Sequence, residues 1–249
     1  SLASNSSGNF NTAIGSEALS SNETGNANTA SGYLSLLYNT TGSDNVAMGA
    51  FSLFENGTGK GNVAVGANAL RANTANGNLV AIGDSALYNQ NGGIGLNTAV
   101  GAKSLFANTT GAINTAVGNN ALFSNTTGSS NTALGTAALF SNTVGKNLVA
   151  IGDSALFNQS LSTAFFPGYD NTAVGSKSLF SNTSGIFNTA TGSRSLFKNT
   201  TGTFNTANGA SALFSNTTGL GNVAMGYFAL NSNTTGNSNT AIGTSTLLF

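Results

Sequence analysis

The sequence predicts an all-β protein, a parallel β-solenoid or β-roll of about fourteen 17-residue coils. A pentapeptide of the form Asn-Thr-Ala-x-Gly recurs along the chain, and most copies are 17 residues apart. Asn, Gly, Thr and Ser recur every few residues, which disfavours helices. A unit of this length fits one solenoid coil with two short strands, each of about four or five residues, separated by Gly/Asn turns.

The Gly that ends the pentapeptide sets the register of the repeat. It occurs fourteen times from Gly15 to Gly243, in steps of 17 residues except for 18 after Gly83 and 23 after Gly152. Counted from the residue four before this Gly, the consensus is N-[TV]-A-[IVM]-G-x-x-[AS]-L-[FY]-x-N-T-T-G-x-x. We expect a single solenoid over residues 1–249, with a looped insertion around 158–170 and no second domain. The chain starts and stops within a unit, which predicts a segment of a longer protein or of an end-to-end assembly.

Five columns of the repeat have a direct physical interpretation. Ala at position 3 and Leu at position 9 hold in all fourteen copies, which predicts a tightly packed interior. The invariant Gly at position 5 predicts a positive φ or a backbone approach that leaves no room for a Cβ. Asn at positions 1 and 12 predicts stacked amide ladders, in which each side chain bonds the next coil and stabilises its own turn.

Position 10 carries an aromatic column that bears on association. It is aromatic in nine copies and polar at Ser20, Arg71 and Asn231. Neighbours in a strand point to opposite faces, so an inward Leu at position 9 places the ring outward. Such a column predicts either a subunit interface or a corner where both residues turn inward. The candidate interface residues are Phe106, Phe123, Phe140, Phe157, Phe180, Phe197 and Phe214, and the column also contains Phe54 and Tyr88.

The pentapeptides 11–15, 45–49 and 62–66 resemble the head repeats of trimeric autotransporter adhesins of the YadA type. Similar arrays occur in bacterial and phage tail-fibre-like proteins. The resemblance covers essentially the whole chain. It implies a left-handed parallel β-roll, three chains wide, that projects from a surface and adheres. The 17-residue period is longer than the usual coil of that family.

Composition excludes most chemistry. The chain has no His or Cys, seven Lys/Arg and seven Asp/Glu, which leaves no imidazole base, thiol nucleophile or ordinary zinc site. So few cations argue against nucleic-acid binding, and no apolar segment reaches the length of a membrane helix. Asp84 and Asp153 share a column four coils apart, too far for a catalytic pair. We expect no catalytic residues, cofactor or metal.

Two polar patterns have competing interpretations. Asn-x-Ser/Thr sequons indicate either glycosylation or simply the turn chemistry of the coil, and we favour the turn. Threonine columns (Thr109, Thr126, Thr143; Thr183, Thr200, Thr217) could order water on a flat face, as in ice-binding solenoids. The sequons fall at Asn5, Asn22, Asn39, Asn56, Asn108, Asn125, Asn158, Asn182, Asn199, Asn216 and Asn233.

These observations predict a non-enzymatic structural fibre or adhesin segment, extracellular, at the cell surface or on a phage particle. The partners would be further copies of the chain, as a trimer or an end-to-end filament, and a cell-surface or carbohydrate target. The alternatives are a carbohydrate- or ice-binding module and a phage tail-fibre shaft. The insertion holds the only Pro of the chain beside Phe165, Phe166 and Tyr169. These three aromatics form a candidate contact loop, unless the loop folds back over the sheet.

Overall fold

A computed structural model describes residues 1–160 and 170–248 in two compact units, Ser1–Thr127 and Gly128–Phe249. Both units are all-β and contain the same coil. Position numbers 1 to 17 below follow the consensus.

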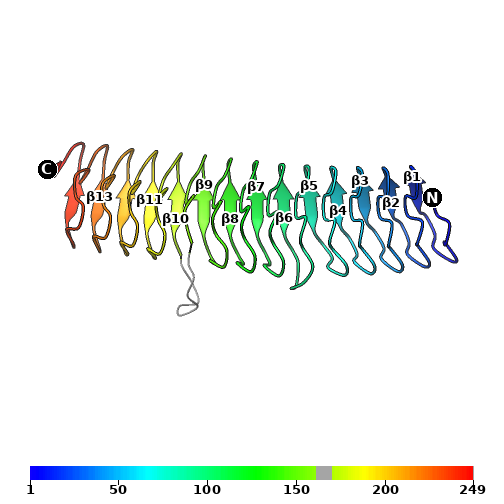
Figure 1. The fold of residues 1–249 in the computed structure, drawn as a ribbon. Coiled ribbons are helices and arrows are strands. Elements are labelled where there is room, and N and C mark those ends of the chain that lie inside the picture. The colour runs from blue at the N-terminus through cyan, green and yellow to red at the C-terminus, as the bar shows by residue number, and fades with distance from the viewer. Residues whose placement is uncertain (161–169, 249) are drawn as a thin grey trace. The chain divides into compact units, whose positions relative to one another are not determined.

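In the first unit, each coil contributes one three-residue strand to a parallel sheet in chain order (Figure 1). Equivalent residues pair directly, as Ala30 does with Ala47. The ladder continues without interruption from the first strand to the seventh. The strands are β1 (Thr12–Ile14), β2 (Thr29–Ser31), β3 (Val46–Met48), β4 (Val63–Val65), β5 (Val80–Ile82), β6 (Thr98–Val100) and β7 (Thr115–Val117).

The second unit repeats this arrangement with the same register. Thr172 pairs directly with Val149, so the strands flanking the 23-residue step are neighbours. The strands are β8 (Thr132–Leu134), β9 (Val149–Ile151), β10 (Thr172–Val174), β11 (Thr189–Thr191), β12 (Thr206–Asn208), β13 (Val223–Met225) and β14 (Thr240–Ile242). The predicted parallel β-solenoid with a 17-residue spacing is thus confirmed.

The predicted second strand of each coil is wrong for the described residues. Positions 7 and 9 adopt left-handed backbone conformations, with φ of +57° at Lys177 and +49° at Leu179, and such residues interrupt an extended strand. Backbone bonds still join this turn to both neighbouring coils. Leu179 N–H donates to the Ser195 carbonyl and Lys177 N–H to the Asp153 carbonyl.

The core consists of the predicted Ala and Leu columns. Ala at position 3 is buried from Ala30 to Ala241, and Leu at position 9 is buried from Leu19 to Leu230. A left-handed conformation costs a non-glycine residue about 1–3 kcal/mol. Full burial of a Leu side chain stabilises by a similar amount, about 1.5–3 kcal/mol. Packing therefore offsets the strain that each core Leu carries.

The Gly column at position 5 meets both predicted requirements. Gly192 has φ +122°, and a Cβ there would lie 2.6 Å from the backbone of Gly209 in the next coil. No side chain fits between coils at this position, because the obstructing atoms belong to backbone.

Two buried amide ladders join successive coils, as predicted. In one, Asn199 Nδ2 donates to Asn182 Oδ1 and Asn216 Nδ2 donates to Asn199 Oδ1. In the other, Asn188 Oδ1 accepts from Asn205 N–H and Nδ2–H. The side chains at these ladder positions are fully buried. A buried amide needs partners, so the ladders fix the register of the coils.

A backbone carbonyl joins the two ladders in most regular coils. Gly202 O at position 15 accepts from Asn188 Nδ2 at 2.8 Å and from Asn199 Nδ2 at 3.0 Å. We call this three-residue contact the glycine clamp. It recurs at Gly25, Gly42, Gly59, Asn76, Gly111, Gly145, Gly185, Gly219 and Gly236.

Candidate functional site

The aromatic column at position 10 is a stack of half-buried rings beside the buried Leu column. In the second unit, neighbouring centroids are 5.0–5.3 Å apart and the ring planes lie within 15° of each other. In the first unit, Tyr88, Phe106 and Phe123 stack at 5.3 Å. The stack in the second unit comprises Phe140, Phe157, Phe180, Phe197 and Phe214.

Ring orientation determines what this column can contact. Phe157, Phe180 and Phe197 each have a stacked ring on both sides, and all three are only half-buried. Their faces are therefore occupied, and the exposed part is the ring edge. These residues lie in a turn and not in a strand, and whether the column is an interface stays a prediction. A row of apolar edges suits another apolar surface, whereas sugar stacking requires free ring faces.

Arg71, a polar exception in the column, continues the stack. Its guanidinium lies 5.4 Å from the Phe54 centroid and 5.8 Å from that of Tyr88, and Nη1 donates to the Tyr88 hydroxyl at 2.6 Å. The same group lies 5.3 Å from the Phe51 ring. A planar cation over aromatic faces is favourable, so the exception preserves the ring contacts.

A second apolar column lies on the outer face of the strands. Position 4 is followed by Gly and points away from the buried Ala of position 3. Its side chains are 39–67% exposed in six coils, at Ile14, Met48, Ile82, Leu134, Met225 and Ile242. Sequence reasoning missed this face, although the three-residue alternation around the invariant Ala would have indicated it.

The threonine columns take part in bonding between coils. Thr183 Oγ1 donates to the Thr200 carbonyl at 3.1 Å, and Thr200 Oγ1 donates to the Thr217 carbonyl at 3.0 Å. In the first unit, Thr109 Oγ1 donates to the Thr126 carbonyl at 3.1 Å. These hydroxyl protons are thus bound within the fold.

Most sequon asparagines are ladder members. Asn199, for example, is fully buried and donates to Asn182 and to Gly202. The interpretation of these sequons as turn chemistry agrees with this burial. The fully buried ones are Asn22, Asn39, Asn56, Asn108, Asn125, Asn182, Asn199 and Asn216.

The remaining predicted site lies outside the described residues. Phe165, Phe166 and Tyr169 fall within 161–169, so the contact loop stays a prediction.

Asp84 and Asp153 are both exposed, and Asp84 Oδ2 accepts from Ser85 Oγ at 3.1 Å. The described part of the chain contains no cluster of three acidic, His or Cys residues suited to a metal ion. It also contains no helix long and apolar enough to span a membrane.

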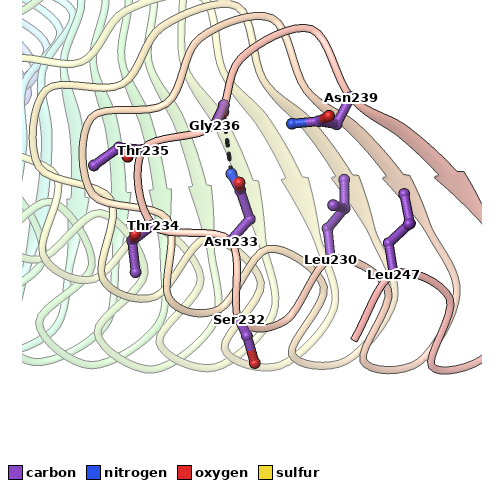
Figure 2. Close-up of a pocket in the computed structure, with 8 residues that line it drawn as sticks. All are labelled: Leu230, Ser232, Asn233, Thr234, Thr235, Gly236, Asn239 and Leu247. Carbon is purple, nitrogen blue, oxygen red and sulfur yellow. Dashed lines mark hydrogen bonds between the residues drawn. The ribbon is translucent and has the colours of Figure 1, made fainter. Parts of the chain in front are cut away.

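A pocket of about 380 Å³ lies at the last coil of the second unit (Figure 2). Asn233 Nδ2 donates to Gly236 O there, and Leu230 and Asn239 also line the space. These are the core, clamp and ladder positions that pack against the following coil elsewhere in the unit. We therefore assign this pocket no small ligand.

Two coils depart from the ladder pattern in the same way. Leu79 and Leu148 replace the Asn of position 1, and Gln90 and Gln159 replace the Asn of position 12. All four side chains are fully buried. Each pair precedes one of the two irregular steps of the repeat. Sequence reasoning missed these pairs, although aligning the coils by position would have revealed them.

A scan against protein-family models matches no family, and a search of curated proteins finds no similar sequence.

Proposed function

We propose that this chain is a non-enzymatic structural segment of an extracellular fibre or adhesin. The observation that carries the proposal is the amide ladder system. In the regular coils, buried Asn side chains bond the next coil or their own turn, and these bonds link one coil to the next. A chain organised in this way resists local opening, which suits a structural element exposed to proteases.

Self-association through the aromatic column is part of this proposal, with a second copy of the chain as partner. The ring edges form a regular apolar row, and Phe180, Phe197 and Phe214 repeat at the coil spacing. A second copy has the same spacing, so edges can meet coil by coil along the column. A partner with a different period would lose that match after a few rings.

The proposed location is the cell surface or a phage particle. The resemblance of the pentapeptides to YadA-type head repeats supports it, as does a sequence without His or Cys. Adhesion to a cell-surface or carbohydrate target would then depend on the insertion or on neighbouring segments. The regular coils would supply length and stiffness.

The two binding alternatives have weaker support. Carbohydrate recognition on the aromatic column would need ring faces that stacking already covers. Ice binding on the Thr columns would need hydroxyls aimed at water, whereas Thr183, Thr200 and Thr217 donate to the next coil.

Light scattering of the purified chain, with thermal-hysteresis and glycan-binding assays on the same sample, tests the proposal. We expect particles heavier than the 24.7 kDa chain, no thermal hysteresis and no glycan binding by the regular coils. A monomer that shows thermal hysteresis or retains glycans would contradict it and favour a binding module.

A further inference from the structure

The two Leu–Gln coils lack the glycine clamp. In a regular coil, one position-15 carbonyl accepts from the Asn side chains at positions 1 and 12, as Gly111 O does from Asn97 and Asn108. Leu79 and Leu148 have no amide to donate. Gln90 Nε2 donates instead to Gly92 O at 2.7 Å, one residue after position 13. In the Leu79 coil, the turn that follows is thus free of the side-chain bond from position 1.

Backbone bonding changes at the same point. In several regular coils, the N–H groups of positions 13, 14 and 15 all donate to one carbonyl of the next coil, as those of 183–185 do to Thr200 O. In the Leu79 coil, Asn91 N–H makes this bond to Thr109 O at 3.2 Å. In the Leu148 coil, Ser160 N–H makes it to Thr183 O, also at 3.2 Å. In the Leu79 coil, the chain leaves the regular path directly after position 13.

The Gln restores the ladders that the missing Asn would interrupt. Gln90 Oε1 accepts from Asn97 Nδ2 at 3.0 Å and also from Asn108 Nδ2, so one carbonyl serves both ladders of the next coil. Gln159 Oε1 does the same for Asn171 at 3.3 Å and Asn182 at 2.6 Å. The extra methylene of Gln supplies the reach for this double contact.

The preceding coil shows what the substitution costs. Asn73 Oδ1 is buried and has no donor, because Gln90 directs its amide to Gly92 instead of backwards. Gln159 Nε2 likewise finds no acceptor among the described residues. A buried polar group without a partner is destabilising, so the pair is useful only where a coil must open.

We call positions 13 to 15 of a coil the glycine turn. We infer that a buried Leu at position 1 together with a Gln at position 12 releases this turn, and that coils with this pair are where the solenoid presents loops. The loop after Gln90 is the described example. Asn76 Nδ2 bonds Gly93 O at its base, and Ile94 beside it is 68% exposed. Leu fills the interior, Gln restarts both ladders, and the residues between are free to vary.

The first test removes the Leu–Gln pair and the extra residue from the Leu79 coil. Three variants of the full chain are compared: deletion of Ile94, which restores 17 residues and leaves Gly93 at position 15; L79N/Q90N; and all changes together. We expect each partial variant to melt below wild type. The combined variant should melt at least about 4 °C above both, because the clamp and the bond to Asn73 can form.

The second test introduces the Leu–Gln pair into a regular coil. Six Gly/Ser residues are inserted after Thr217, in wild type and in N205L/N216Q, and the double substitution alone is the control. We expect the insertion to lower the melting temperature less in the Leu–Gln background, while the control melts below wild type. Hydrogen exchange of the strand amides 206–208 and 223–225 gives a local readout if global melting is broad. Equal insertion penalties in both backgrounds, or additive effects in the first test, would overturn the inference.

Discussion

The two turns of a regular coil differ in what they bury, since one is flanked by buried polar side chains and the other carries half-exposed apolar rings. Beside the glycine turn, the buried ladder positions 1 and 12 carry Asn in every coil except the two Leu–Gln coils. The opposite turn, at positions 7 to 10, leaves apolar rings half-exposed, and its position 10 carries Leu37, Arg71 and Ser20 as well as Phe. A buried amide that loses its partner lowers the free energy of unfolding by about 1–3 kcal/mol. Substituting a half-exposed ring lowers it by less. The aromatic column is therefore the surface on which our proposal places association.

Replacing Leu122 by Asp should have the largest effect, because both turns share this core. Leu122 is fully buried beside Phe123, so the substitution places an unpaired charge in an apolar column. We expect a loss of more than about 4 kcal/mol in the free energy of unfolding and loss of the β-signal in circular dichroism. Wild-type melting would show that the coil register is wrong.

Replacing Asn199 by Ala should interrupt one Asn ladder and leave the aromatic column unchanged. The substitution removes bonds to Asn182 and Gly202 and the acceptor of Asn216. We expect a loss of about 2–4 kcal/mol, measured by thermal melting. Asn208→Ala is the matched control, because Asn208 is exposed on the outer face of β12, and it should change stability by less than about 0.5 kcal/mol. Equal losses in both variants would refute the role given to the ladder.

The smallest effect is expected where backbone strain can be relieved. Ala137 has φ +54° at position 7, so Ala137→Gly should stabilise by about 0.5–1 kcal/mol. Its neighbour Ala138 is buried and lacks a positive φ, and Ala138→Gly should destabilise by about 1 kcal/mol. The same sign for both changes, measured in one denaturant series, would argue against the left-handed turn.

The sequence predicts more of the fold than of the site, for physical reasons. Repetition aligns equivalent residues, so the invariant Gly, the buried Leu and the Asn ladders follow from position alone. The single short strand does not, because side chains as different as Glu17, Lys177 and Ala137 adopt positive φ without any Gly signal. The clamp could not be predicted either, since it depends on where one carbonyl lies between two side chains. Exposure of the ring edges required the stacking geometry.

The central claim is that the Asn ladders stabilise the fold, whereas the aromatic column binds a second copy of the chain. Sedimentation equilibrium of wild type and of F180S/F197S/F214S tests it most directly, with F187S/F204S as control because those rings stack in a different column. We predict an oligomer for wild type and for the control. The triple variant should retain its β-signal and sediment as a single 24.7 kDa chain. A monomeric wild type, or a triple variant with undiminished mass, would contradict the claim, and the latter would point to the outer strand face instead.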